Sequence, residues 1–248
     1  MTNKEFVDKL INIVNNYKTV YAYGTFGQKI TKSIINQKSK QYPNWYTQTR
    51  KNNLLNLVGK NYFGFDCVGL IKGVLWGWNG SNTVNGGAKY ESNGVPDVNA
   101  NTMINKCNNI STNFNNITMG ELLWMNGHVG IYYKNGQVIE CSPAFNNKVQ
   151  ITQLSQRAWK KHGFLPWITY DNNQFLPPRG YFKKGDSGKN VEKICDFLSG
   201  FVKGDYFGDY AVSCTKVFQK QNGLEPDGNI GPLTLAKMKE KGFVEYNN

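Results

Sequence analysis

The sequence has little of what a metal site or a disulfide framework requires. Its 248 residues include two histidines, His128 and His162, and five cysteines, at positions 67, 107, 141, 195 and 214. The cysteines are odd in number and form no C-x-x-C pair, so neither a disulfide framework nor a zinc ribbon is expected. Two histidines also supply a His-rich zinc site poorly. We therefore expect no metal and no cofactor.

Long apolar runs are missing as well. No run approaches the roughly 18 residues that a membrane-spanning helix needs. The first segment, MTNKEFVDKLINIVNNYK, interleaves charge with apolar residues at helical spacing, unlike a secretory signal. We therefore expect a protein made in the cytoplasm, without signal peptide and without stable membrane insertion. It would need another route to any target outside the cell.

Acidic residues are outnumbered by basic ones, and the excess is uneven. The net charge is +12, residues 1–178 hold 18 Lys and Arg against 8 Asp and Glu, and residues 179–248 hold 11 against 9. A basic surface favours a polyanionic partner. Nucleic acid is not expected, because no nucleic-acid-binding motif accompanies the charge. Teichoic acids of a bacterial wall are another candidate, and a diffuse solvated surface is the plain alternative.

A break in composition divides the chain near residue 178. The segment TYDNNQFLPPRGYF, residues 169–182, is rich in Asn, Pro and Gly and is typical of a linker. We therefore expect one domain over residues 1–178 and a second over 179–248. The second contains three helical patterns in succession. Cys195 and Cys214 occupy apolar positions of these patterns, so we expect both in its core.

This second domain resembles the peptidoglycan-binding three-helix module over about residues 180–243. The resemblance rests on spaced motifs in the same order: G-D-S-G at 185–188, Y-F-G at 206–208, V-F-Q at 217–219 and D-G-x-x-G-P at 227–232. It implies a small all-α domain that binds bacterial cell wall peptidoglycan.

The first domain mixes helix and strand patterns. Residues 4–17 and 66–78 carry apolar stripes at helical spacing. The segment GELLWMNGHVGIYYKNGQVIECSP predicts a β-hairpin, with the strongest turn signal of the chain at Asn135-Gly136. Helices followed by a meander of strands predict an α+β domain.

Cys67, in FDCVGLIKGVLWGW, is either a core residue or a nucleophile. Burial is the ordinary state of a free cysteine. However, Cys67 opens a helix, where backbone N–H groups favour the thiolate and lower the thiol pKa. His128 opens a strand between small residues and is the natural base. A helix-borne Cys with a strand-borne His is the papain-type arrangement, but the pattern alone leaves both interpretations open.

Three segments resemble NlpC-type cell-wall cysteine peptidases. FDCVGL is similar to their D-C-S-G-[FL] motif, GHVGIYYKNGQVIECSP to their catalytic hairpin, and TVYAYGTFG to the tyrosine-containing segment before the nucleophile. The resemblance covers about residues 17–145 and implies a papain-like fold with helices packed on an antiparallel sheet. Val68 replaces the usual Ser, Glu140 stands where a His is common, and the insertion over 26–62 matches no motif.

The resemblance also implies roles for individual residues. Cys67 would be the nucleophile and His128 the base, with Glu140 orienting the imidazole and stabilising its protonated form. Tyr21 would line the cleft and donate to the oxyanion together with the Cys67 backbone N–H, unless it is a core aromatic. Asp66 would position or cap the start of the helix.

Other aromatic and basic residues are weaker candidates. Trp76 and Trp124 are candidates for a substrate groove, although each also suits a core position. His162 lies beside two lysines in WKKHGF, and we expect it to be a structural residue at the surface.

The hairpin turn decides whether Glu140 reaches His128. A two-residue turn at Asn135-Gly136 would place the two side chains on opposite faces, because side chains alternate along a strand. A three-residue connection, Lys134 to Gly136 with a glycine bulge, pairs Gly130 with Glu140 and returns Glu140 to the face of His128. We therefore predict a bulged hairpin and a Glu140–His128 hydrogen bond.

Together these features predict a peptidoglycan hydrolase that cuts an amide bond of the stem peptide. The resemblance implies the bond between D-glutamate and the diamino acid, with the bond between muramic acid and L-alanine as the alternative. The Asn-rich segments are similar to phage lysins of Gram-positive hosts, which implies an endolysin released through holin pores and acting as a monomer. A catalytically inactive wall-binding protein and an acyltransferase or toxin on the same fold are the rival classes.

Overall fold

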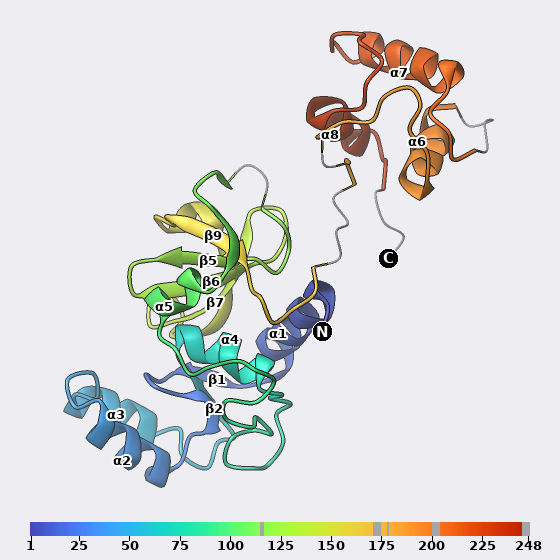
Figure 1. The fold of residues 1–248 in the computed structure, drawn as a ribbon. Coiled ribbons are helices and arrows are strands. Elements are labelled where there is room, and N and C mark those ends of the chain that lie inside the picture. The colour runs from blue at the N-terminus through green and yellow to red at the C-terminus, as the bar shows by residue number, and fades with distance from the viewer. Residues whose placement is uncertain (115–116, 171–174, 178, 200–203, 245–248) are drawn as a thin grey trace. The chain divides into compact units, whose positions relative to one another are not determined.

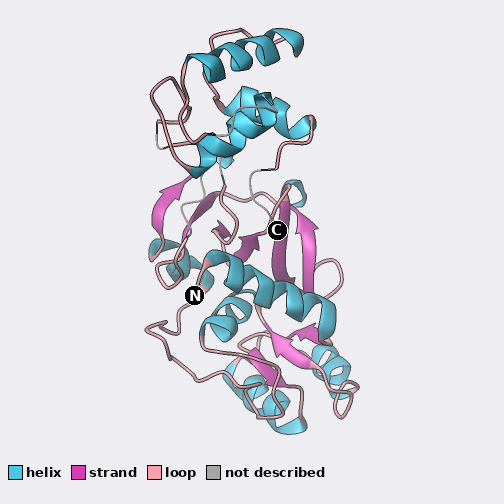
Figure 2. Cartoon of the chain, turned by 90° about the vertical axis from the view of Figure 1, so that its right-hand side faces the viewer, coloured by secondary structure: helices cyan, strands magenta, loops and turns pink. Residues whose placement is uncertain are grey.

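The computed structural model describes residues 1–114, 117–170, 175–177, 179–199 and 204–244. The chain forms two compact units, Met1–Asp171 and Asn172–Asn248. The domain boundary expected at residue 178 falls on a residue outside those described. The first unit mixes helices and strands, whereas the second is built of helices and loops (Figure 2).

The first unit contains five helices and two sheets among its described residues. The helices are α1 (Asn3–Asn16), α2 (Lys32–Gln41), α3 (Gln48–Leu55), α4 (Cys67–Leu75) and α5 (Ala100–Asn105). The smaller sheet has the order β1-β3-β2, from β1 (Thr19–Tyr21), β2 (Phe26–Lys29) and β3 (Phe63–Phe65). Strand β1 runs parallel to β3, and β2 runs antiparallel to it.

The larger sheet is antiparallel throughout and has the order β4-β9-β5-β6-β7-β8. Its strands are β4 (Asn108–Ser111), β5 (Leu122–Met125), β6 (His128–Tyr132), β7 (Gln137–Ser142), β8 (Lys148–Gln153) and β9 (Lys161–Phe164), and the short 3-10 helix η2 (Leu154–Gln156) follows β8. This mixed architecture confirms the predicted α+β class.

Helix α4 is the central element of the first unit. It lies between the larger sheet and the strands β1 and β2 (Figure 1). All nine of its residues are buried, which fits a sequence that is apolar except for Lys72. The Lys72 ammonium is paired with the Asp97 carboxylate. Gly69 and Gly73 let the helix backbone approach the preceding segment closely, because a Cβ at either position would overlap the carbonyl oxygen of Thr25 or Phe26.

Three hydrogen bonds join the smaller sheet to the larger one. The Tyr21 backbone N–H donates to the Asn147 carbonyl at 2.9 Å, and the Val149 N–H donates to the Thr19 hydroxyl at 3.1 Å. The Cys141 thiol of β7 donates to the Phe65 carbonyl of β3 at 3.2 Å. Cys141 is therefore a structural link between the two sheets.

The second unit consists of α6 (Lys189–Ser199), α7 (Asp209–Gln221) and α8 (Pro232–Glu240). Its core includes Val191, Ile194, Phe207 and Ile230. Cys195 lies in that core, as predicted, whereas Cys214 is only partly buried.

Candidate active site

Asp66 fixes the start of the helix that carries Cys67. Strand β3 ends at Phe65, and the extended backbone of Asp66 makes it the N-cap of α4. Its Oδ1 accepts from the Gly69 N–H at 2.6 Å, and its Oδ2 accepts from the Gly24 N–H at 2.8 Å. The predicted capping role of Asp66 is therefore confirmed, and Cys67 becomes the first helical residue.

Cys67 lies at the junction of α4 and β6. Its residue is 7% exposed, and backbone N–H groups of Val129, Val68 and Cys67 itself point at the sulfur. Burial, and next the nearby Asp66 carboxylate, nevertheless raise the pKa of the Cys67 thiol to about 12. The N–H groups at the helix start do lower this pKa, as expected, but the loss of hydration outweighs them and the net pKa is raised.

His128 is the first residue of β6, and its imidazole ring contacts Trp159 and Glu140. The ring stacks on Trp159 with centroids 5.7 Å apart and an interplanar angle of 22°. Its Nε2 lies 2.6 Å from Oε2 of Glu140. Among the described residues, no hydrogen bond joins the ring to the Cys67 sulfur. Since Nε2 is occupied, Nδ1 is the nitrogen left to exchange a proton.

The hairpin between β6 and β7 has the predicted register. Ile131 pairs with Ile139 and Tyr132 with Val138, which places Gly130 opposite Glu140. Asn135 and Gly136 both have positive φ, at 50° and 72°. The predicted hydrogen bond from His128 to Glu140 is confirmed.

Glu140 is a buried carboxylate, 1% exposed, with three side-chain donors. Besides His128, its Oε1 accepts from Thr152 Oγ1 at 2.6 Å and from Arg157 Nε at 2.9 Å. Burial alone would raise its pKa, but the hydrogen bonds from His128, Arg157 and Thr152 together hold the pKa below its usual value. Glu140 is therefore ionised at neutral pH.

Arg157 and Thr152 are the members of this network that the sequence analysis did not predict. Arg157 follows η2, contacts Glu140 and also donates from Nη2 to the Ser142 hydroxyl at 2.7 Å. No motif contains it. Strand alternation on β8 gives a signal for Thr152 alone, because Glu140 pairs with Gln150 and Thr152 lies on the same face one repeat further on.

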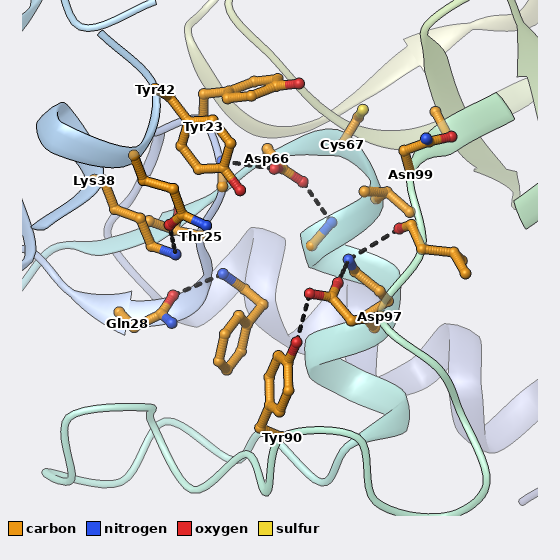
Figure 3. Close-up of a pocket in the computed structure, with 18 of the residues that line it drawn as sticks. Tyr23, Thr25, Gln28, Lys38, Tyr42, Asp66, Cys67, Tyr90, Asp97 and Asn99 are labelled. Carbon is orange, nitrogen blue, oxygen red and sulfur yellow. Dashed lines mark hydrogen bonds and ion pairs between the residues drawn. The ribbon is translucent and has the colours of Figure 1, made fainter. Parts of the chain in front are cut away.

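Cys67 lines a pocket of about 860 Å³ (Figure 3). Asp66, Asn99, Asn101 and Gly127 also line it. The insertion over residues 26–62 forms much of another wall and contributes the side chains of Gln28, Ile34, Gln37, Lys38, Gln41 and Tyr42. Most of these groups are amides and hydroxyls, which suit the hydrogen-bonding groups of a peptide.

The tryptophan predictions have different outcomes. Trp76 is 1% exposed, and its Nε1 donates to the Val95 carbonyl at 2.8 Å. It belongs to the core, so its predicted place in a substrate groove was wrong. Trp124 is partly exposed and donates from Nε1 to Oδ1 of Asn101 at 3.0 Å. Asn101 lines the pocket, whereas Trp124 is not among the described residues that line it.

Tyr21 is close to Cys67 but is buried, at 7% exposed. Burial, and next the charge of Cys67, raise the pKa of its phenol far above the usual value. The hydroxyl is therefore neutral and able to donate a hydrogen bond. The prediction that Tyr21 lines the cleft was wrong, because it belongs to the buried core and is not among the described residues that line the pocket.

His162 is buried, not at the surface as we had expected. Its Nδ1 lies 2.5 Å from Oε2 of Glu121, and its Nε2 donates to the Asn113 carbonyl at 2.9 Å. Strand alternation explains the error, because His162 and the lysine before it point to opposite faces of β9. The pair is separate from the Cys67 pocket.

Two general properties complete the description of the site. Within the described ranges, no three His, Cys, Asp or Glu side chains come together in a way that would hold a metal ion. None of the described helices has the length and apolar character needed to cross a membrane.

A buried cysteine at a helix start, a histidine on an adjoining strand and a carboxylate bonded to that histidine are typical of papain-like cysteine hydrolases. The comparisons with protein families agree. The model of the NlpC/P60 family matches residues 55–167, and that of the putative peptidoglycan binding domain matches residues 193–238. The chain therefore carries an NlpC/P60 domain followed by a peptidoglycan-binding domain, which confirms the predicted architecture.

Comparison with individual proteins adds little. No curated protein matches the chain. A crystal structure of a periplasmic domain of the EpsAB fusion protein of the Vibrio vulnificus type II secretion system is 17% identical over 48% of this chain. The match spans 55% of that structure, about half its length, with a TM-score of 0.25. So low a score supports no inference about fold or function.

Proposed function

We propose that this protein is a peptidoglycan hydrolase that cleaves an amide bond of the stem peptide with Cys67 as the nucleophile. The two domains support hydrolysis of peptidoglycan as the general activity. The observation that carries the finer proposal is the bonded pair His128–Glu140. His128 directly precedes Val129, whose backbone N–H reaches the Cys67 sulfur, and Cys67 lines a pocket rich in amide groups. Of the stem-peptide bonds, we propose the one between D-glutamate and the diamino acid.

The first chemical step is transfer of the thiol proton to His128. Because the pKa of Cys67 is about 12, the resting enzyme holds a neutral thiol. His128 Nδ1 takes the proton as the sulfur attacks the amide carbonyl, and Glu140 stabilises the imidazolium through Nε2. The N–H groups of Val68 and Val129 that point at the sulfur stabilise the forming thiolate and offset part of the free-energy cost of its desolvation.

The tetrahedral intermediate then collapses to a thioester. The Cys67 backbone N–H and the neutral Tyr21 hydroxyl are the proposed donors to the carbonyl oxygen while it carries negative charge. His128 returns its proton to the leaving amine, and the C–N bond breaks. A water molecule, deprotonated by His128, next attacks the thioester, which releases the carboxylic acid and regenerates the thiol.

The second domain would keep the enzyme on its insoluble substrate. Tethering raises the effective concentration of stem peptides around the first domain. The excess of basic residues in 1–178 would favour anionic wall polymers such as teichoic acids. A phage endolysin that reaches the wall through holin pores and works as a monomer is the biological setting that we propose.

Digestion of purified Gram-positive wall followed by mass spectrometry tests the proposal. We expect soluble muropeptides with a new free amine on the diamino acid, and a new amine on L-alanine would instead indicate the amidase. Cys67→Ala and Cys67→Ser should release nothing while keeping the wild-type circular dichroism. Cys107→Ala, at another buried cysteine of the same unit, is the matched control and should stay active. Activity in a folded Cys67 variant would overturn the mechanism.

A further inference from the structure

Lys38 stands at an inward position of helix α2. The helix begins after Thr31, whose hydroxyl accepts from the Ile34 N–H, and its buried residues are Ile34, Ile35 and Lys38. These positions share one face at helical spacing. Lys38 is 9% exposed, whereas Lys40 on the same helix is exposed. A lysine on the apolar face of an amphipathic helix is unusual, because burial of an ammonium is costly without a counter-charge.

The Lys38 ammonium lacks such a counter-charge among the described residues. Its Nζ donates to the amide oxygen of Gln41 at 3.2 Å and lies 5.9 Å from the centre of the Tyr42 ring. Both partners are neutral. Burial lowers the pKa of Lys38, and the more distant carboxylates of Asp66 and Asp97 offset this only in part.

The two carboxylates that line the same pocket already have donors. Asp97 pairs with Lys72 and accepts from the Tyr90 hydroxyl at 2.8 Å. Asp66 accepts two backbone N–H groups, from Gly24 and Gly69. Lys38 is therefore the pocket's unneutralised cation within the described part of the chain.

Lys38 and Cys67 line the same pocket, on opposite sides of it in Figure 3. A molecule that presents its carbonyl to Cys67 can therefore extend towards Lys38. We propose that Lys38 binds a carboxylate of the stem peptide and makes the enzyme selective for the ionised form over the amidated form. This inference rests on the proposed function.

Two carboxylates of a stem peptide have the required chemistry. When D-glutamate is joined through its side chain, its α-carboxylate stays free unless the wall carries an amide there. The terminal carboxylate of the peptide is the second source. Amidation of either group removes the charge but keeps the shape, so the two sources can be separated by matched substrates.

The test uses the full chain and disaccharide–L-alanine–D-glutamate–L-lysine muropeptides. L-Lysine is chosen because its side chain adds no further carboxylate. Four versions carry a carboxylate or a carboxamide at the glutamate α-position and at the C-terminus. Wild type, Lys38→Met, Lys38→Arg and the matched control Lys40→Met are compared by kcat and KM, with cleavage read by mass spectrometry.

We expect wild type to prefer the carboxylate at one of the two positions by about 10- to 100-fold in kcat/KM, the range for a hydrogen bond to a charged group. Lys38→Met should abolish that preference through KM, Lys38→Arg should restore part of it, and Lys40→Met should behave as wild type. The position whose amidation matters identifies the source.

The failures can be told apart. If wild type cleaves all four peptides equally, or if Lys38→Met lowers kcat/KM for all of them equally, Lys38 has no role in selectivity and the inference is wrong, while the hydrolase stands. If wild type cleaves none of them, the proposed stem-peptide activity fails and the inference fails with it.

Discussion

Replacement of Glu140 by Gln separates the proposed catalytic role of the carboxylate from its structural role. Glu140 receives donors from His128, Thr152 and Arg157 at 2.6, 2.6 and 2.9 Å. Glutamine keeps the shape but offers one acceptor oxygen and one amide group. If its oxygen faces Arg157, its amide faces Nε2 of His128 and forces the ring proton onto Nδ1, the nitrogen that has to accept the thiol proton. If its oxygen faces His128, its amide opposes the guanidinium.

Both arrangements also leave the imidazolium without a counter-charge, so we expect kcat to fall by about 10²- to 10⁴-fold, the usual contribution of general acid–base catalysis. The partly buried Arg157, whose side chain is 14% exposed, also loses its charged partner. Breakage of a buried ion pair lowers the free energy of unfolding by about 3–5 kcal/mol. That loss is a large share of the roughly 5–15 kcal/mol that stabilises a typical domain.

A second variant distinguishes the two effects. Glu140→Gln combined with Arg157→Met removes the guanidinium that has lost its counter-charge. The double variant should therefore unfold at a higher temperature than Glu140→Gln, while its activity stays as low as that of Glu140→Gln. Wall-lysis rates and calorimetry on the full chain measure both quantities. If Glu140→Gln retains more than about a tenth of the wild-type rate, or if the double variant recovers activity along with stability, the reasoning about the His128–Glu140 pair is refuted.

Two further predictions concern the thiol and the second domain. Because burial and Asp66 raise the pKa of Cys67 to about 12, the thiolate fraction should increase about tenfold per pH unit from pH 7 to 10. Alkylation of Cys67 by iodoacetamide, followed by peptide mass spectrometry, should therefore accelerate without a plateau; a plateau below pH 8 would indicate a preformed thiolate–imidazolium pair. Residues 180–248 expressed alone should sediment with Gram-positive wall without lysing it, and a fragment that stays in the supernatant would count against wall binding.

The parts of the site that depend on local pattern could be predicted from the sequence. Asp66 as a cap and Cys67 as the first helical residue follow from the order of residue types at a helix start. The register of the hairpin follows from strand alternation, since only an odd connection brings Glu140 to the face of His128. These relations extend over a few residues, and short-range geometry determines them.

The parts that depend on packing between distant elements could not be predicted. Arg157 reaches Glu140 from a loop beyond the next strand, and no spacing rule links the two. Trp76 was misplaced because it caps α4 on the side that faces the core, where Val95 accepts its N–H. Lys38 did carry a usable signal, since positions 34, 35 and 38 share one helical face, but the pocket in front of that face is visible only in the structure.

The residues to which we assign catalytic roles are held by two different sheets. Cys67 follows β3 of the smaller sheet, whereas His128 and Glu140 belong to the larger one. The sheets meet through α4 and through a few hydrogen bonds such as that from Cys141 to Phe65. The distance from the Cys67 sulfur to the His128 imidazole therefore depends on how the smaller and the larger sheet pack together.

The rate of turnover should therefore depend strongly on the contact between the two sheets. A shift of about 1 Å between nucleophile and base can cost about a hundredfold in rate, while both sheets keep their own strands paired. Mild denaturant, or a substitution between the two sheets, would then lower the activity before the spectroscopic signals of unfolding change. In the proposed mechanism, Thr19 and Cys141, which are not among the described residues that line the pocket, would thereby influence the rate of catalysis.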